Sequence, residues 1–263
     1  MTICAPLAAR RAQAGQFVML RVGEWGERFP LTIAGYDREK GTITVIFQPV
    51  GKSTALLAAL NEGDSVTDLT GPLGKPSHLE GLKRVCVVGG GLGCAIAYPQ
   101  AAELYRQGAE VHIIGGFRNK ELIILEDEMR AVSSRLHICT DDGSNGHNGL
   151  VTDALKRQIE EGNAYDAVVA IGPLVMMKFV CLVTEPFNIR TYVSMNPIMI
   201  DGTGMCGGCR VTVGGAVKFA CVDGPDFDGH EVDFDEAIRR SAAYREKEET
   251  ARHGCGLFKG VTA

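Results

Sequence analysis

The stretch at residues 199–221 constrains this chain most, because it concentrates cysteine and glycine beside one aspartate. Two residues separate Cys206 from Cys209, and four residues separate Asp201 from Cys206. This is the C-x4-C-x2-C…C spacing of a plant-type [2Fe–2S] loop, with aspartate at the first position and Cys221 at the last. The intervening glycines would let the loop wrap closely around a cluster and point backbone N–H groups at its sulfurs.

Other interpretations of this stretch stay open. Three clustered cysteines with an aspartate could bind zinc, although structural zinc sites usually contain two Cys-x2-Cys pairs and this chain has one. The cysteines could also be buried thiols in a glycine-rich turn, since free cysteine is a common core residue. The fourth cluster ligand is open too, because Asp201 has the right spacing but Cys255 is a rival. A carboxylate is a harder ligand than a thiolate and should alter the reduction potential of the cluster.

Length and composition exclude several classes of protein. The 263 residues are enough for two or three domains, and 45% of them are hydrophobic, which provides a core. A net charge of −5 without a basic run argues against nucleic-acid binding. The apolar stretches at 85–97 and 167–183 are shorter than the ~20 residues of a membrane span, and the N-terminus lacks a signal-peptide core. Nine cysteines without a pairing pattern favour a reducing cytoplasm over a disulfide scaffold.

Residues 13–75 predict a small antiparallel β-barrel. Short runs of β-branched or aromatic residues, the expected strands, lie at 17–22, 31–34, 42–47 and 65–69. One helix interrupts them at 54–60. Its entry at 51–54 has the small and hydroxyl residues that favour an anion at a helix N-terminus. Taken alone, however, this entry is more typical of an ordinary capped helix.

Residues 84–195 alternate strand and helix, which predicts a parallel doubly wound sheet. The expected strands are 84–88, 110–114, 136–139, 167–171 and 190–193. The expected helices are 92–107, 125–132, 152–161 and 175–184.

The first of these strands runs into a glycine-rich turn that is followed at once by a helix. The turn contains Gly89, Gly90, Gly91 and Gly93. Glycine there permits a tight turn and lets a pyrophosphate approach the helix N-terminus. The match to G-x-G-x-x-G is incomplete because position 94 is cysteine, but its place between a strand and a helix favours a dinucleotide site.

Two further loops follow strands of the same sheet. One contains Thr140, Asp141 and Asp142, and the other runs from Gly172 and Pro173 to Met176 and Met177. Ligands of such sheets bind outside the carboxyl ends of the strands, so both loops could line the pocket. The second could equally be an ordinary strand-to-helix turn with methionines as core fillers.

The C-terminal part contains the cysteine loop, a hairpin-like run at 211–219 and an acidic segment at 223–235, which we expect to be a solvated surface loop. Apolar residues at helical spacing predict a final helix from 234 to about 252. We expect His230 and His253 to be surface residues. The tail at 253–263 has no clear pattern.

With these features in place, the chain resembles the electron-transfer subunits of the ferredoxin–NADP reductase superfamily, in which barrel, dinucleotide sheet and [2Fe–2S] loop follow in this order. It most resembles the small (alpha) subunits of NADH-dependent ferredoxin:NADP oxidoreductases, also described as sulfide dehydrogenases. The related dihydroorotate dehydrogenase electron-transfer subunits have a cysteine where this chain has Asp201. The resemblance covers about residues 12–250. It is carried by residues 14–18, 28–34, 37–44, 125–129, 140–144, 171–173 and 201–215.

The resemblance implies cofactors and the residues that hold them. For FAD on the barrel, these are Arg28, Phe29, Pro30, Leu31, Thr32, Phe47, Gln48, Gly51, Ser53 and Thr54. For NAD(H) or NADP(H) on the sheet, they are Gly89, Gly90, Gly91, Gly93, Thr140, Asp141, Asp142, Gly172, Pro173 and Met176. For the [2Fe–2S] cluster, they are Asp201, Cys206, Cys209 and Cys221. The relatives begin with a further barrel strand, so the resemblance implies that this strand is missing here.

The resemblance also implies three domains, at 1–80, 81–195 and 196–263, and a large glutamate-synthase-like partner with FAD and [4Fe–4S] clusters that connects to ferredoxin. The function it implies is electron transfer between NAD(H) and that partner, including an electron-bifurcating role. Hydride transfer to a flavin needs stacked rings rather than a general acid, and Thr32 would tune the flavin by hydrogen bonding. The alternatives are an electron-transfer subunit of dihydroorotate dehydrogenase and a non-catalytic, redox-sensing regulator that binds a dinucleotide.

Overall fold

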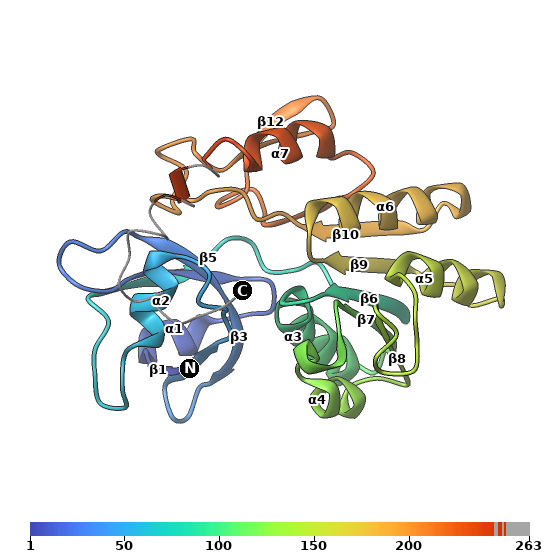
Figure 1. Cartoon of the computed structure of the whole chain (residues 1–263), viewed down its shortest axis with the longest axis horizontal. Helices are drawn as coiled ribbons and strands as arrows, with labels where there is room; N and C mark the ends of the chain where they lie inside the picture. The colour runs from blue at the N-terminus through green and yellow to red at the C-terminus, as the bar shows by residue number, and fades with distance from the viewer. Residues whose placement is uncertain (245–246, 249, 251–263) are drawn as a thin grey trace.

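The structure is a computed structural model that describes residues 1–244, 247–248 and 250. Three sheets organise these residues. Figure 1 shows an N-terminal antiparallel sheet on the left, a larger sheet with its helices on the right and a small two-stranded sheet above them. Within the described residues, no helix is both long enough and apolar enough to cross a membrane.

The N-terminal sheet is antiparallel and open. Its strands are β1 (Thr2–Cys4), β2 (Phe17–Arg21), β3 (Phe29–Asp37), β4 (Thr42–Val45) and β5 (Asp68–Leu73), and its helices are α1 (Pro6–Arg11) and α2 (Lys52–Ala58). The strand order is β1-β4-β3-β2-β5. β-Bulges between Phe17 and Met19 and between Ile33 and Gly35 bend β2 and β3. One face encloses a core that includes Leu20, Ile43 and Leu57.

Two predictions for this region need correction. The predicted small antiparallel barrel is confirmed only as an open antiparallel sheet in the described residues, because β1 pairs only with β4 and β5 only with β2, which leaves both as edges. No element was predicted before residue 13, yet β1 and α1 lie there. The three-residue β1 is too short for a pattern of alternating residues, and only its pairing with β4 defines it.

The larger sheet confirms the predicted parallel doubly wound arrangement. Its strands are β6 (Arg84–Gly90), β7 (Glu110–Phe117), β8 (Arg135–Thr140), β9 (Ala167–Ile171), β10 (Arg190–Ser194) and β13 (Asp226–Asp228). Its helices are α3 (Gly93–Arg106), α4 (Glu126–Ala131), α5 (Val151–Glu160) and α6 (Leu174–Thr184), with short 3-10 turns at η1 (Lys120–Leu122) and η2 (Glu185–Phe187). The order is β13-β10-β9-β6-β7-β8, and all neighbours except β13 and β10 are parallel.

Side-chain alternation along the central strand explains why helices cover both faces. Val85 and Val87 pack with α3 and α4, whereas Cys86 and Val88 pack with α5 and α6. All four residues are fully buried. A strand that is apolar on both faces is typical of such a sheet, and the parallel direction of its strands places their carboxyl ends at one edge, where loops can meet.

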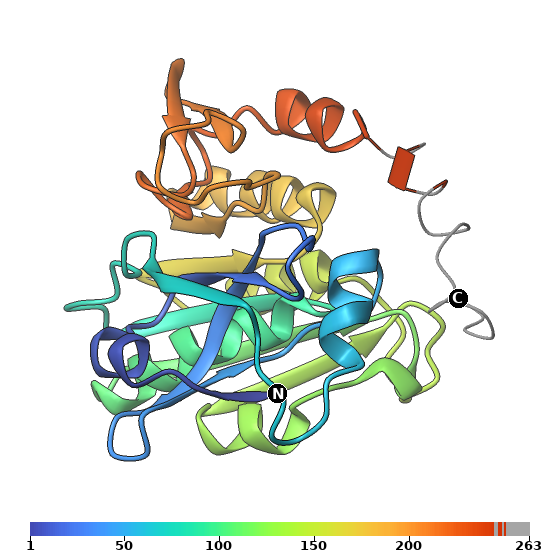
Figure 2. The same ribbon diagram turned by 90° about the vertical axis from the view of Figure 1, so that its left-hand side faces the viewer.

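The C-terminal part returns to this sheet. The hairpin of β11 (Arg210–Val213) and β12 (Ala216–Phe219) confirms the predicted run, and Figure 2 shows it with α7 (Phe234–Ser241) above the large sheet. The predicted solvated loop at 223–235 is wrong in part, because β13 pairs with β10 and buries Phe227. The predicted helix from 234 to about 252 is interrupted by a turn at residues 242–244, and the described residues 247, 248 and 250 beyond the turn are helical. His253 and Cys255 lie outside the described residues.

Candidate functional site

The glycine-rich turn between β6 and α3 is shaped by close packing. A Cβ on Gly93 would lie 2.2 Å from the carbonyl oxygen of Ile171, and one on Gly90 would lie 2.4 Å from Sδ of Met176. Gly91 has φ +55°, and a Cβ there would meet nothing within 4 Å. Glycine therefore lets this turn pack against the end of β9 while its outer side stays open to a ligand.

The predicted loop after β9 lies directly beside this turn. A Cβ on Gly172 would be 3.1 Å from Cα of Gly90, and Pro173 precedes the first residue of α6. Met176, in the first turn of α6, reaches back to Gly90. The structure thus brings Gly172, Pro173 and Met176 together with the glycine turn at the carboxyl edge of the sheet.

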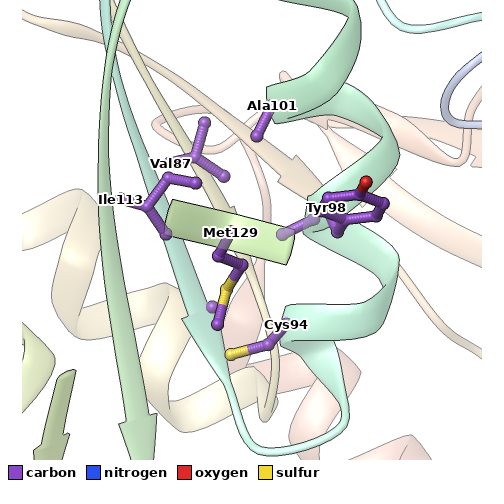
Figure 3. A pocket seen from close by; sticks show the side chains of 8 residues that line it. Val87, Cys94, Tyr98, Ala101, Ile113 and Met129 are labelled. Atoms are coloured by element: carbon purple, nitrogen blue, oxygen red, sulfur yellow. The ribbon is translucent and has the colours of Figure 1, made fainter. Parts of the chain in front are cut away.

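Cys94, which replaces the last glycine of the dinucleotide pattern, faces inward. Figure 3 shows its sulfur in a small apolar pocket beneath α3, near Met129. The side chain has no exposed surface, and a Cβ on Gly89 would lie 2.6 Å from the Cys94 sulfur. Burial raises the pKa of the Cys94 thiol to about 12, so the thiol is neutral and acts as a small apolar group. The incomplete motif reflects packing under the turn.

The loop after β8 lies at the same edge of the sheet, but β7 separates it from the glycine turn. Thr140 is fully buried, and its hydroxyl donates to Asn145 Oδ1 at 2.9 Å. The Asp142 carboxylate accepts from the side chain and backbone of Ser144, which lowers its pKa. The Asp141 N–H donates to a carbonyl at the end of β7. These groups order the loop itself, and contact with a nucleotide stays a prediction.

The predicted flavin residues begin at the start of β3. Residues 29–32 are half-buried, and Thr32 is the register partner of Phe17 on β2. Arg28 lies just before β3, with Nη2 3.5 Å from Oδ2 of Asp68. Because β3 also contacts α3, the predicted flavin strand and the nucleotide helix are neighbours in space.

The predicted pyrophosphate entry behaves as a capped helix. The Gly51 N–H donates to the Thr54 hydroxyl at 3.1 Å, and that hydroxyl donates to the Gly51 carbonyl at 3.0 Å. Ser53 lies in the first turn of α2, and Phe47 and Gln48 follow β4. The ordinary-cap interpretation is therefore present in the structure, and phosphate contact at this entry stays a prediction.

The cysteine loop places two buried thiols side by side. Cys209 and Cys221 are each 2% exposed, and their sulfurs are 3.2 Å apart because the β11–β12 hairpin joins them. Two thiolates bound at about 2.3 Å to one tetrahedral metal lie roughly 3.8 Å apart, which is close to this separation. Burial is the main cause that raises the pKa of the Cys221 thiol to about 12, and hydrogen bonding with the Cys209 thiol is the next. A bound metal would deprotonate this thiol.

The other two predicted ligands lie on the exposed side of the same loop. Cys206 is exposed, and the Gly208 N–H lies 3.4 Å from its sulfur. The Asp201 carboxylate accepts from the Cys206 N–H at 2.8 Å and from the hydroxyl and N–H of Thr203. Hydrogen bonding from Cys206 and Thr203 lowers the pKa of Asp201, so it is a carboxylate.

Among the described residues, no three metal-binding side chains converge on a single ion. One loop nevertheless presents the three sulfurs and the carboxylate of the predicted cluster. The sequence analysis missed Thr203, which holds Asp201 in place. The Asp-Gly-Thr order at 201–203 is typical of a turn closed by an aspartate side chain and could have indicated it.

Comparison with known proteins gives consistent matches over most of the chain. Residues 196–233 match the family model described as the iron-sulfur cluster binding domain of dihydroorotate dehydrogenase B. A Thermotoga maritima homologue of the dihydroorotate dehydrogenase B (NAD(+)) electron transfer subunit is 47% identical over 246 residues, covering 94% of this chain and 86% of the relative. The corresponding Bacillus caldolyticus subunit is 36% identical over 242 residues, covering 88% and 91%.

A solved structure is similar across the whole fold. It comes from work on flavin-based electron bifurcation by an NADH-dependent reduced ferredoxin-NADP oxidoreductase. The match has a TM-score of 0.90 and 45% identity, and it covers 96% of this chain and 91% of that one. The match to a single solved chain therefore includes the open N-terminal sheet, the doubly wound sheet and the cysteine loop.

Proposed function

This chain belongs to the family of dihydroorotate dehydrogenase B electron-transfer subunits and their homologues, and we propose that it transfers electrons between NAD(H) and a partner subunit. FAD, when bound, supplies the exchange between two-electron and one-electron transfer, and the [2Fe–2S] cluster supplies one-electron storage. The proposal rests on the cysteine loop, in which two buried thiols lie 3.2 Å apart. The same chain has a glycine turn that is open to a nucleotide.

The nucleotide site that we propose lies at the carboxyl edge of the large sheet. The open side of Gly91 leaves the start of α3 accessible to a pyrophosphate, and Gly172 and Pro173 form the facing wall. The full set that we propose is Gly89, Gly90, Gly91, Gly93, Thr140, Asp141, Asp142, Gly172, Pro173 and Met176.

The flavin site that we propose lies on the N-terminal sheet. Half-buried backbone and side chains at the start of β3 offer a surface next to α3, on which a flavin ring can face the nucleotide edge. The Thr32 hydroxyl tunes the flavin by hydrogen bonding. The full set that we propose is Arg28, Phe29, Pro30, Leu31, Thr32, Phe47, Gln48, Gly51, Ser53 and Thr54. On this proposal, residues 1–80 carry FAD, 81–195 the nucleotide and 196–263 the cluster.

The ligands of the cluster site that we propose are Asp201, Cys206, Cys209 and Cys221. The Gly208 N–H, which lies 3.4 Å from the Cys206 sulfur, would stabilise negative charge on a cluster sulfur. All described cysteines are free thiols, which fits a reducing compartment, and we assign the protein to the cytoplasm.

The partner contacts the chain at the cluster loop. Exposed apolar side chains surround Cys206 there: Met205 is 89% exposed, Ile200 is 59% exposed and Val222 is 39% exposed. Apolar residues grouped on a surface mark protein interfaces. We propose that the partner is a large glutamate-synthase-like subunit with FAD and [4Fe–4S] clusters, which connects the chain to ferredoxin, in a bifurcating complex.

Anaerobic stopped-flow spectroscopy tests this function directly. Protein purified with its co-expressed partner is mixed with NADH, and absorbance is followed at flavin and iron–sulfur wavelengths. We expect flavin bleaching followed by cluster bleaching. Flavin bleaching with a cluster that never reduces would contradict the proposed electron path, and no bleaching with either NADH or NADPH would contradict the function.

A further inference from the structure

Residues 74–80, which link β5 to β6, lie where the three parts of the molecule meet. The Ser77 N–H donates to the Ala14 carbonyl at 3.0 Å, next to β2. The Lys75 N–H donates to the Gly224 carbonyl at 2.6 Å, just after the cysteine loop. A Cβ on Gly15 would lie 2.1 Å from the Ser77 hydroxyl, so only glycine there allows this approach.

One carboxyl group, that of Asp226 on β13, connects these parts. Its Oδ2 accepts from the Ser77 hydroxyl at 2.5 Å and from Nε2 of Gln100 at 3.1 Å. Ser77 belongs to the linker and Gln100 to α3, the helix that begins at the nucleotide turn. Gln100 has no exposed surface. A single side chain therefore joins the linker from the flavin sheet, the nucleotide helix and the strand that follows the cluster loop.

Two oxygen atoms in this contact have no hydrogen-bond partner. They are Oδ1 of Asp226 and Oε1 of Gln100, and both are shielded from solvent. If the carboxyl is ionised, both atoms are acceptors and both stay unsatisfied, which is costly for buried groups. One proton on Oδ1 changes this, because a carboxylic acid can donate to the amide oxygen while the amide N–H donates to the acid.

We propose that Asp226 is held as a neutral carboxylic acid paired with Gln100, and that this pair fixes the flavin sheet, α3 and the cluster-bearing segment relative to one another. Asp226 is then a positioning residue for electron transfer from the flavin to the cluster. The neutral pair stands on the contacts alone, whereas its effect on electron transfer rests on the proposed function.

The surroundings of Asp226 support the neutral form. Burial raises the pKa of its carboxyl, and the nearby hydroxyls of Ser77 and Ser194 and the amide of Gln100 oppose this only in part. His78, on the linker, is the charged or titratable neighbour that also opposes it. Ser194 is the register partner of Asp226 on β10, so the linker, α3 and β10 face the carboxyl with the neutral side chains of Ser77, Gln100 and Ser194, and with His78.

The pH dependence of unfolding tests the neutral pair. A raised native pKa means that the native protein loses stability as pH rises above the ordinary carboxyl pKa of about 4. Asp226→Asn keeps one donor and one acceptor without a titrating proton. We expect its melting temperature to match the wild type near pH 4 and to exceed it increasingly at higher pH. Asp228→Asn, two residues along β13, is the control and should show no widening gap.

The opposite sign would overturn the proposal. If Asp226 is ionised and stabilising, Asp226→Asn melts below the wild type at neutral pH and the two converge in acid. Infrared difference spectra give a second measurement, because the carbonyl band of a protonated carboxyl should be present in the wild type and absent from Asp226→Asn.

Rapid-mixing kinetics on the complete complex test the positioning role. Asp226→Ala leaves Gln100 and Ser77 unpaired, so we expect the melting temperature to fall by about 5 °C. We expect cluster reduction to slow relative to flavin reduction, and Asp226→Asn to restore both the melting temperature and the rate of cluster reduction. Unchanged cluster reduction in Asp226→Ala would overturn the positioning role. A wild type that NADH does not reduce would instead contradict the proposed function and leave the pH result standing.

Discussion

The nucleotide turn and the cluster loop are both rich in glycine, but they need it for different reasons. In the nucleotide turn, Gly93 is required because a Cβ would lie 2.2 Å from a backbone carbonyl of the neighbouring turn. In the cluster loop, Gly202, Gly204 and Gly207 all have positive φ, at +80°, +88° and +67°. A Cβ on Gly207 would meet its nearest neighbour only at 3.7 Å. At Gly93 the reason is packing and at Gly207 it is backbone conformation, whereas Gly202 combines both, because a Cβ there would lie 2.7 Å from Cγ of Met19.

This difference indicates how each region keeps its shape. The nucleotide turn is held by the adjoining β9–α6 turn, so we expect it to be formed without nucleotide. The cluster loop is held by hydrogen bonds within itself, from Thr203 and Cys206 to Asp201, and it leaves Cys206 exposed. We therefore expect the cluster loop to depend on its metal, and the nucleotide turn to tolerate metal loss.

We expect the largest difference between the two regions when a buried cluster ligand is removed. We expect Cys209→Ala to lose nearly all iron and acid-labile sulfide while nucleotide binding is kept, because the nucleotide turn is held by the β9–α6 turn and not by the cluster loop. Iron and sulfide analysis with nucleotide titration measures both. Cys181→Ala, which removes a buried thiol outside the loop, is the control and should keep its iron. Full iron content in Cys209→Ala would contradict the ligand assignment.

A methyl group in the nucleotide turn should have the next largest effect. Gly93→Ala forces a Cβ into the Ile171 carbonyl, and we expect a loss of about 3 kcal/mol in unfolding free energy. Gly91→Ala meets open space and suffers only its positive φ, at about 1 kcal/mol. Chemical denaturation of both variants without nucleotide measures the difference. Equal losses would show that packing does not explain the glycine at 93.

Replacing the aspartate tests the cluster loop more gently. We expect Asp201→Cys to keep a [2Fe–2S] cluster with a changed visible spectrum and reduction potential, because a soft thiolate replaces a hard carboxylate. Absorption and electron paramagnetic resonance spectra detect the change, and Asp223→Asn is a charge control on the same segment. A spectrum identical to the wild type would mean that Asp201 is not a ligand.

The smallest expected effect concerns the flavin sheet. Thr32→Val removes one hydroxyl without changing side-chain shape, and we expect flavin reduction by NADH to slow by about fivefold, the value of one hydrogen bond. Thr44→Val on β4 is the matched control. Stopped-flow traces at saturating NADH compare them, and an unchanged rate in Thr32→Val would remove Thr32 from the proposed flavin contacts.

Local patterns predicted the parts of the fold that depend on local sequence. The continuous apolar runs of β6 and β9 and the helix after the glycine turn were predicted almost to their ends, because strand and helix periods are local properties. The spacing of Asp201, Cys206, Cys209 and Cys221 likewise predicted one loop that carries all four side chains, and the paired sulfurs of Cys209 and Cys221 fit that prediction.

Long-range pairing explains what the sequence could not indicate. Asp226 lies in a run of acidic residues and looked solvated, yet pairing of β13 with β10 places its carboxyl among Ser77 and Gln100, which are more than 100 residues away. The open N-terminal sheet was missed for the same reason, since strand runs alone do not say which strands form edges. Cys94 departs from the G-x-G-x-x-G pattern in the sequence, and its buried position beneath α3 is apparent only in the structure.

Metal, sulfide and flavin analysis of anaerobically purified protein, with its visible spectrum, tests whether the chain carries a [2Fe–2S] cluster and a flavin. We expect about two irons, two sulfides and one FAD for each chain. Colourless protein, with zinc or no metal bound to the cysteine loop, would contradict this expectation.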